Sequence, residues 1–351
     1  MHSMKHQDTL VIGGVDSHAD THHAAAMDQR GALLATKGFP TTTPGYRELL
    51  DWLCAFGEVD VVAVESTGSY AAALVRYLRG HGVRVLEINQ PHAHTRRRRG
   101  KSDAIDAEMA ARLVLSGKAT AVPKQTDGIV ESIRLLRAAR HSAVKSRSAA
   151  IVQLGGLIIT APQELRDQLA ARRTIRGKAA LCRRLRPTTD ELARPAQAAK
   201  FALRSIAQRI DALDDEIAVL DRQLDQLVRV AAPGTVQLLG ISTGHAGRLL
   251  VTAGENIERL RGEGAFAANR TLHLIAVCRL RYCERTRAYA KRRTAEGKTK
   301  PEIMRCLKRY IARETYHALL ADLTVLQPPT PPATTTINCG AGPIGISRHR
   351  T

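Results

Sequence analysis

The sequence predicts an α/β N-terminal domain, with a mixed sheet and helices on both faces, followed by a mostly α-helical region that contains a coiled coil. In the first 90 residues, apolar runs of strand length alternate with helical spacings. Residues 203–227 repeat apolar side chains every three or four residues. Residues 1–95 hold 7 Lys and Arg against 10 Asp and Glu, although the whole chain carries a net charge of +20. An acidic front domain therefore precedes strongly basic regions, a charge balance that favours nucleic acid or an anionic membrane as partner.

Seven elements of strand or helix length fill the first domain. The expected strands are 10–16, 22–27, 33–37, 59–65 and 83–88, with a turn at 28–31. The expected helices are 44–55 and 69–81, and a further helix begins at Ser102. The order β-β-β-α-β-α-β and then a helix is that of an RNase H-like domain.

Four acidic residues stand at the ends of these elements. Asp16 and Glu65 each close a strand, and Asp103 and Asp106 open the last helix three residues apart, on one helical face. Strand-end carboxylates meet at one edge of an RNase H-like sheet, so all four can converge. Hard divalent cations prefer oxygen ligands, and the four residues predict a catalytic site for two Mg²⁺ ions, with Mn²⁺ as an alternative. Asp16, at the centre of the edge, is the candidate bridging ligand.

Three histidines follow Asp16 closely and raise the question of zinc. His18, His22 and His23 lack a second Cys or His cluster at zinc-ligand spacing, so zinc is the weaker interpretation. His18 is instead a candidate contact for a metal-bound water or a phosphate. Two-metal carboxylate sites cleave or join phosphodiester bonds. A sugar kinase of related fold would need Gly-rich phosphate loops, and the sequence has no convincing one.

Basic residues near the carboxylates and along the later helices predict nucleic acid as the partner. A run of cations lies directly before Asp103 and would hold a phosphate backbone beside the metals: Arg96, Arg97, Arg98, Arg99 and Lys101. Residues 127–169 should be helical, with a basic face that includes Arg134 and Arg137, a merely solvated face being the alternative. Residues 270–313 hold 14 Lys and Arg against 3 Asp and Glu, and would neutralise several phosphates through side chains such as Lys291, Arg292 and Arg293.

The clearest periodicity lies in residues 203–227. Its apolar side chains follow the a/d spacing of a coiled coil: Leu203, Ile206, Ile210, Leu213, Ile217, Leu220, Leu224 and Leu227. Such a seam needs a partner strand. The partner would come from self-association, as a dimer or tetramer, or from an earlier helix within 127–169. A helix packed in a bundle is the alternative.

A Gly-containing turn follows at residues 238–250. Two apolar residues, a Gly-Ile turn and a helix of small residues resemble a helix-hairpin-helix element. The turn around Gly240 and Gly244 would offer backbone N–H groups to a phosphate, and an ordinary turn between helices is the alternative. The tail, residues 326–351, is rich in Pro, Thr and Gly and is expected to be disordered.

Three sequence blocks resemble the DEDD-type transposases of bacterial insertion sequences. GVDSHADTHH, VAVESTGSY and KSDAIDAEMAARL are similar to the family's successive blocks, which places its four acidic positions at Asp16, Glu65, Asp103 and Asp106. The resemblance covers roughly residues 9–320. It implies an RNase H-like (Holliday-junction-resolvase-like) catalytic domain, a coiled coil and a C-terminal transposase domain. It also implies Mg²⁺, DNA recombination, oligomers that hold two DNA partners, and a structured guide RNA.

The chain departs from this family in the C-terminal domain, where the family carries a serine nucleophile. Residues 264–268 look like the helix before the serine block, and residues 269–273 look like the segment after it. No serine occurs between Ser242 and Ser347. The block is therefore expected to be deleted, which predicts DNA and metal binding without the covalent serine–DNA link. Ser242 is a weak substitute nucleophile.

Four parts follow from this interpretation. They are a DEDD catalytic domain (9–125), basic helices with the coiled coil (126–231), a truncated transposase domain (232–325) and the tail (326–351). The expected function is that of a transposase or DNA recombinase. A junction-resolving nuclease and a non-catalytic DNA-binding remnant that inhibits through mixed oligomers are the alternatives. The polar N-terminus is no signal peptide, and no run reaches the ~18 apolar residues of a membrane helix, so a cytoplasmic location without membrane contact is expected.

Overall fold

The computed structural model describes residues 9–65, 67–88, 102–257, 260, 262 and 270–326. The described chain forms two compact units. The first holds the described residues up to Gly128, those from Ala253 to 262, and those from Leu323 onward; the second holds Ile129–Thr252 and the described residues from 270 to Asp322. The predicted boundaries at 125, 231 and 325 stay a prediction. Within the described residues, no helix is both long enough and apolar enough to cross a membrane.

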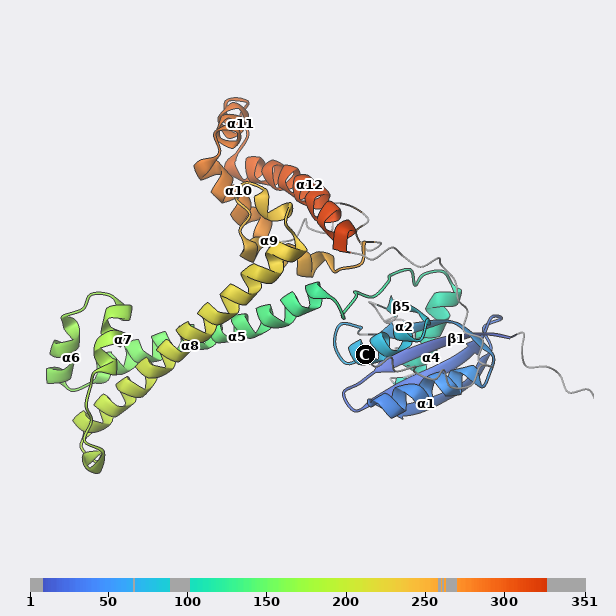
Figure 1. Cartoon of the computed structure of the whole chain (residues 1–351), viewed down its shortest axis with the longest axis horizontal. Helices are drawn as coiled ribbons and strands as arrows, with labels where there is room; N and C mark the ends of the chain where they lie inside the picture. The colour runs from blue at the N-terminus through green and yellow to red at the C-terminus, as the bar shows by residue number, and fades with distance from the viewer. Residues whose placement is uncertain are drawn as a thin grey trace, which may run out of the picture. The chain divides into compact units, whose positions relative to one another are not determined.

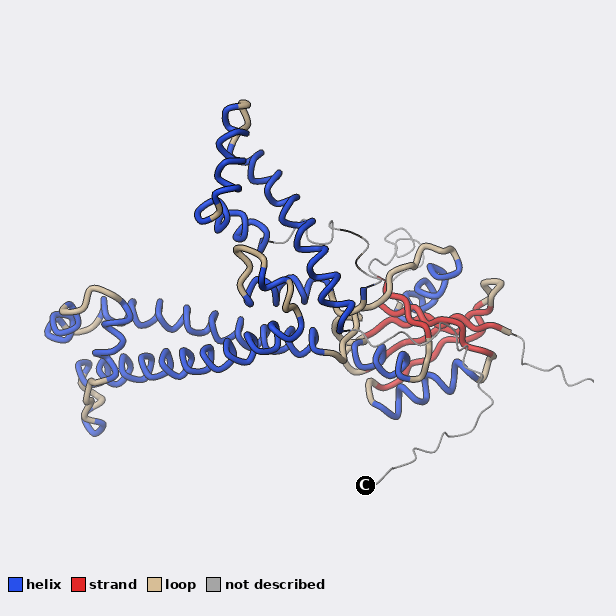
Figure 2. Tube along the Cα trace, turned by 45° about the horizontal axis from the view of Figure 1, so that its top comes forward, coloured by secondary structure: helices blue, strands red, loops and turns tan. Residues whose placement is uncertain are grey.

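A mixed five-stranded sheet forms the centre of the first unit (Figure 2). Its strands are β1 (Leu10–Ser17), β2 (Thr21–Asp28), β3 (Leu33–Pro40), β4 (Glu58–Glu65) and β5 (Arg84–Ile88). They lie in the order β3-β2-β1-β4-β5; β2 is antiparallel to both of its neighbours, whereas β4 is parallel to both β1 and β5. This is the strand order of the RNase H-like fold, which confirms the predicted fold class.

Helices cover both faces of this sheet, as predicted (Figure 1). They are α1 (Thr43–Cys54) and α2 (Ala72–Gly80) on one face and α4 (Asp103–Leu115) on the other. Successive side chains of a strand point to opposite faces. Accordingly, Val15 of β1 belongs to the core shared with α1 and α2, whereas Ile12 packs with Ala111 of α4. The register pairs Val15 with Val64 of β4, so the residues that follow each valine, at the strand ends, share the α4 face.

Gly14 is the point of closest approach between α4 and the sheet. A Cβ at this position would lie 2.1 Å from the carbonyl oxygen of Ala107 and 2.6 Å from the backbone nitrogen of Ala111. Any other residue would therefore push the helix away. Ala107, Ala110 and Ala111 are all buried, so a stripe of small side chains lets α4 rest on the β1 backbone. This contact fixes where the first turn of α4 lies.

The second unit is built on two long helices that lie side by side, α5 (Ile129–Thr160) and α8 (Pro195–Ala231) (Figures 1 and 2). Arg140 pairs with Asp221, and Arg147 pairs with Asp214. The partner number falls as the arginine number rises, so the helices are antiparallel. The predicted seam faces a helix of the same chain, which is one of the two partners the pattern allowed. The coiled coil itself, within the chain or between chains, stays a prediction.

The remaining α-helices of the described residues are α6 (Gln163–Ala170), α7 (Ile175–Arg183), α9 (Thr243–Ala253), α10 (Arg270–Tyr282), α11 (Glu284–Ala295) and α12 (Lys300–Leu326). The helical stretch predicted for 127–169 is interrupted after Thr160. Pro162 lacks a backbone N–H and disfavours helical geometry in the residue before it, so the chain breaks there and restarts as α6. The tail beyond Leu326 lies outside the described residues.

His22 is buried on β2 with neither ring nitrogen hydrogen-bonded within the part of the chain that the structure describes. Its ring stacks on Tyr46, with centroids 5.8 Å apart. Burial is the main cause that lowers the pKa of His22 from 6.5 to about 4, and the nearby charge of His18 adds to it. The folded unit therefore holds this imidazole neutral.

We expect Gly14→Ala to destabilise the first unit by about 1–3 kcal/mol, because the new methyl group collides with helix backbone. Gly80→Ala is the matched control, since a Cβ there meets nothing within 4 Å. Trp52 is the only tryptophan of the chain and packs against the core of this unit, so its fluorescence during urea unfolding reports the difference. Equal midpoints for the two variants would contradict the close contact.

We expect acid to weaken the first unit through His22. The unfolded chain takes up a proton near pH 6.5 and the folded chain only near pH 4, so this stability is complete above pH 6.5. About 3 kcal/mol should be lost as the pH falls to 4. Urea titrations followed by Trp52 fluorescence measure the loss. In His22→Phe, which keeps the stacking on Tyr46, this part of the pH dependence should be absent, and an unchanged slope would refute the assignment.

Candidate metal centre

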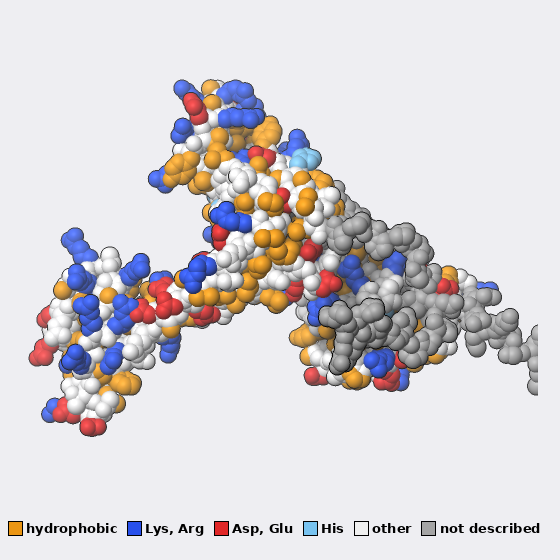
Figure 3. Space-filling model, in the orientation of Figure 1, with side chains coloured by type: hydrophobic (Ala, Val, Ile, Leu, Met, Phe, Trp, Pro, Cys, Tyr) orange, Lys and Arg blue, Asp and Glu red, His pale blue; other side chains and the backbone are white. Residues whose placement is uncertain are grey.

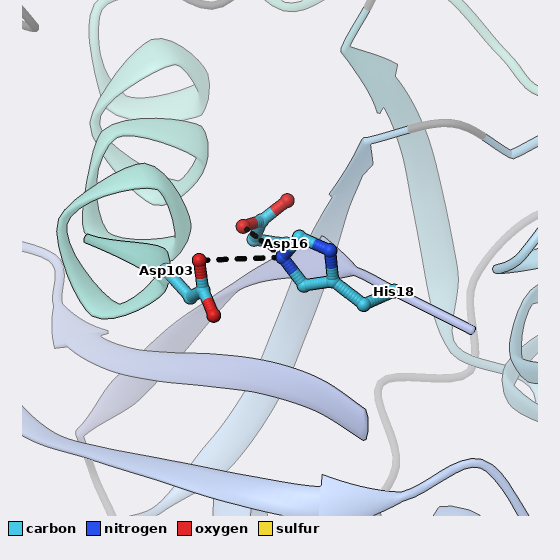
Figure 4. A group of neighbouring side chains, drawn as sticks. All are labelled: Asp16, His18 and Asp103. Carbon is cyan, nitrogen blue, oxygen red and sulfur yellow. Dashed lines mark hydrogen bonds and ion pairs between the residues drawn. The ribbon is translucent and has the colours of Figure 1, made fainter. Parts of the chain in front are cut away.

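Two carboxylates and a histidine meet where β1 ends and α4 begins (Figure 4). Asp16 lies at the end of β1, and Asp103 is the first residue of α4. The Nε2 atom of His18 lies 3.1 Å from Oδ2 of Asp16 and 3.3 Å from Oδ1 of Asp103. His23, which pairs with Asp16 across the β1–β2 ladder, places its Nε2 atom 3.6 Å from Oδ2 of Asp103.

The local sequence explains why these side chains converge. Asp16 is two residues after Gly14 and therefore faces α4, the helix that Gly14 admits. Asp103 precedes the buried Ala107 by one helical turn, and Asp106 precedes Ala110 by one turn. The small-residue stripe that packs on β1 thus continues into both carboxylates. A helix N-terminus also favours negative side chains, which offsets part of their mutual repulsion.

Asp16 is the electrostatic centre of the group, because its residue is only 7% exposed. Burial raises the pKa of its carboxyl group above 3.8, the hydrogen bond and charge of His18 lower it, and the charges of Asp106 and Asp103 raise it further. Because the charge of Asp106 raises the pKa of Asp16, the two carboxylates interact electrostatically. The site therefore gathers negative charge around a buried carboxylate, and a cation would relieve this repulsion.

The donor set fits a divalent metal ion. The ligand atoms of Asp16, His18 and Asp103 all lie within 4.8 Å of one another. Carboxylate oxygens suit Mg²⁺ and Mn²⁺, and one imidazole among them is compatible with Mn²⁺ in particular. Asp16 and Asp103 would hold an ion, His18 contacts both of these carboxylates, and Asp106 adds negative charge nearby.

The other predicted ligand, Glu65, lies on the neighbouring strand end. The hydroxyl of Ser17 donates to the Glu65 carbonyl oxygen at 2.9 Å, so the ends of β1 and β4 are adjacent as expected. Within the described residues, Glu65 is not part of the group whose ligand atoms lie within 4.8 Å of one another. Its role as a ligand stays a prediction. The basic run predicted to hold DNA beside the metals, Arg96 to Arg99 and Lys101, lies outside the described residues.

His18 and His23 were underweighted by sequence reasoning. The spacing of the histidines disfavours zinc, and only His18 received a candidate role from the sequence, as a contact for a metal-bound water or a phosphate. A signal was present in the short turn between β1 and β2, because antiparallel pairing places His23 opposite Asp16 on the same face. The pairing register would have indicated that His23 belongs to the carboxylate edge.

The basic face predicted for α5 is largely engaged within the chain. Arg134 makes two hydrogen bonds of 2.7 Å to Glu131, and Arg140 and Arg147 pair with carboxylates of α8. Arg137 instead donates to the carbonyl oxygen of Gly244 at 3.1 Å.

The predicted Gly-rich turn lies between α8 and α9. Gly240 has a φ of +81°, which only glycine adopts without strain, and Gly244 lies in the first turn of α9. Arg137 thus touches the turn that was predicted to contact phosphate.

A second basic surface lies on α11, where Lys and Arg side chains gather in Figure 3. This helix buries none of its residues and carries Lys291, Arg292 and Arg293. Arg292 and Arg293 lie over the ring of Tyr289, at 5.5 and 6.0 Å from its centroid, and both approach Glu296. Lys291 is an exposed cation on this surface.

Comparison with protein-family models gives a match for part of the chain. Residues 13–159 match the family model DEDD_Tnp_IS110, described as Transposase. The matched segment begins within β1 and ends in α5, so it contains the whole carboxylate group. Comparison with curated proteins gives no match.

We expect Asp16→Asn to abolish binding of divalent metal and to stabilise the metal-free first unit at neutral pH. The substitution removes a buried charge whose ionisation is opposed by burial and by Asp103 and Asp106. Mn²⁺ at about 100 times its dissociation constant should stabilise the wild type by about 2.7 kcal/mol, and the variant not at all. Urea unfolding followed by Trp52 fluorescence, with and without Mn²⁺, measures both effects. Equal Mn²⁺ responses in the two proteins would rule out a metal site at Asp16.

Proposed function

We propose, on the premise that residues 13–159 belong to the DEDD_Tnp_IS110 transposase family, that the chain acts on DNA as an insertion-sequence transposase does, through a metal-dependent carboxylate site. The observation that carries the proposal is the meeting of Asp16, His18 and Asp103, with Asp106 in the same field, at one edge of an RNase H-like sheet. Residues of this kind at such an edge suit phosphodiester cleavage and joining.

The position of each side chain in the site indicates its proposed role. A bound pair of Mg²⁺ or Mn²⁺ ions would activate the attacking oxygen and stabilise the leaving oxygen. Asp16, Asp103, Asp106 and Glu65 are the proposed ligands. His18 touches two of these carboxylates, so it keeps them oriented and can contact a phosphate of the substrate. Burial of Asp16 excludes water from one side of the site.

DNA is the proposed substrate, and a structured guide RNA is the proposed second partner. Residues 270–313 carry 14 Lys and Arg against 3 Asp and Glu, and the exposed helix α11 bears part of this charge. Such a surface attracts polyanions and makes their affinity strongly dependent on salt. Self-association through the 203–227 seam, as a dimer or tetramer, would bring two DNA partners together.

The absence of serine between Ser242 and Ser347 favours a second candidate function. The Oγ atom of Ser242 accepts a hydrogen bond from the backbone N–H of His245 at 3.2 Å, so it serves as a cap for α9. No other serine of the C-terminal region precedes Ser347. The chain would then bind DNA and metal without forming a serine–DNA link, and would act as an inhibitor through mixed oligomers. A nuclease that resolves junctions with water as the attacking group is the third candidate.

We expect the purified chain to cleave a four-way DNA junction in the presence of Mg²⁺ or Mn²⁺, with no covalent protein–DNA adduct. Asp16→Asn should reduce cleavage at least about 100-fold, because a metal ligand is lost. Asp20→Asn is the matched control, since Asp20 is an exposed carboxylate outside the group. Cleavage is measured on sequencing gels, and adducts are measured as shifted bands after denaturation.

The outcomes separate the candidate functions. Cleavage without an adduct favours the water-using nuclease activity of the carboxylate site. An adduct that disappears in Ser242→Ala would restore the serine mechanism. Binding without any cleavage, by both the wild type and Asp20→Asn, favours the non-catalytic remnant. Cleavage that survives in Asp16→Asn would show that the carboxylate edge is not the active site.

A further inference from the structure

We propose that an arginine-lined cavity at the start of α9 binds one phosphate of a nucleic-acid backbone. The cavity lies within the second unit and has a volume of about 240 Å³. Its charged lining residues are Arg137 and Arg140 of α5, Asp221 and Asp225 of α8, and Arg248 of α9, and Ser242 and Thr243 add hydroxyl groups. The inference rests on the proposed function only in its choice of nucleic acid as the partner.

Two arginines at the cavity are available to bind an external anion, because the other charged side chains there are paired within the chain. Arg140 pairs with Asp221 across the helix pair, and Asp225 accepts a hydrogen bond of 2.7 Å from Arg229. Among the described residues, Arg137 and Arg248 have no carboxylate partner within ion-pair distance. The cavity thus contains more positive than negative charge.

The excess positive charge affects the ionisation of Arg137. Burial lowers the pKa of its guanidinium group, and the charges of Arg248 and Arg140 lower it further. A half-buried cation that is repelled by two others is stabilised when an anion enters the space they share. The planar guanidinium group binds phosphate oxygens through paired hydrogen bonds.

The geometry is also preorganised. The carbonyl oxygen of Gly244 accepts a hydrogen bond from Arg137 at 3.1 Å, so the guanidinium group is held at the cavity without closing it. Gly247 keeps α9 close to α8 and α5, since a Cβ there would lie 3.1 Å from Val228 and 3.5 Å from a guanidinium nitrogen of Arg137. The start of α9, an 11-residue helix, adds the positive end of its dipole.

A nucleic-acid backbone fits better than a free phosphate because one side of the cavity is open. Arg248 is exposed and Ser242 is exposed, so a phosphate can enter while the rest of its polymer stays outside. The same unit carries the basic residues 270–313, which supply further contacts for a long polyanion. A single phosphate ion in the cavity would not reach these additional basic residues.

The test is the salt dependence of binding to a fluorescent 30-base-pair DNA duplex, measured by anisotropy with the full chain in EDTA. The site variants are Arg137→Gln and Arg248→Gln, and Arg209→Gln is the control, an exposed arginine of α8 outside the cavity. Each site variant should reduce the slope of log affinity against log salt by about 0.9 and weaken binding about five- to tenfold at 0.1 M salt. The control should leave both quantities close to wild type.

Slopes and affinities equal to those of the control in both site variants would overturn the proposal. Arg137 is half-buried, so helix content and thermal unfolding are measured for its variant; Arg248 is exposed and provides the test if the Arg137 variant does not fold. In a second arm, inorganic phosphate replaces chloride at equal ionic strength. Phosphate should displace the duplex from wild type more than from Arg248→Gln. Thermal stabilisation by phosphate combined with unchanged DNA affinity in the variants would show a free-phosphate site and overturn the backbone assignment.

The salt dependence of DNA binding is measured independently of metal binding at the carboxylate site. EDTA removes divalent metal, so a failure of DNA cleavage leaves this measurement unaffected. Conversely, cleavage that depends on Asp16 but is accompanied by unchanged salt slopes would keep the proposed function and reject the cavity.

Discussion

The contact between Gly14 and α4 is the constraint on which the site depends. The helix backbone comes so close to β1 that even a methyl group has no room between them. Because the stripe of small residues on α4 continues into Asp103 and Asp106, the same contact sets the distance from these carboxylates to Asp16. Packing at one glycine thus decides whether acidic residues almost 90 positions apart in sequence share one electrostatic field.

Charged side chains are arranged differently in the two units. In the first unit, carboxylates gather around the buried Asp16, and the imidazoles of His18 and His23 lie against Asp16 and Asp103. Such an arrangement is costly without a cation. In the second unit, arginines of α5 are matched by aspartates of α8, and these pairs bridge the helices along their length. The basic composition of the chain therefore overstates the number of cations that are available to a polyanion.

Much of the fold could be predicted because it follows from local pattern. Apolar runs of strand length, such as those of β1 and β4, and the helical spacing of α1 each identify one element, and the order of the elements identifies the sheet. The site was less predictable. Asp16 and Asp103 were predicted from their places at element ends and lie together with His18, whereas the position of His23 depended on a strand register that periodicity does not reveal. Pro162 itself indicated a helix break, but the helical periodicity of residues 127–169 led to the prediction of one continuous helix.

The sequence by itself determined the elements, the acidic residues at their ends, the seam of residues 203–227 and the serine-free interval, because these are properties of residue type and spacing. The tertiary structure alone decided which partner the seam meets within the chain, which arginines are paired, and which ligands lie within reach of one ion. The physical reason is that these outcomes depend on distances of a few ångströms between segments far apart in sequence. Such distances are set by packing, as at Gly14, and by strand register, as at His23.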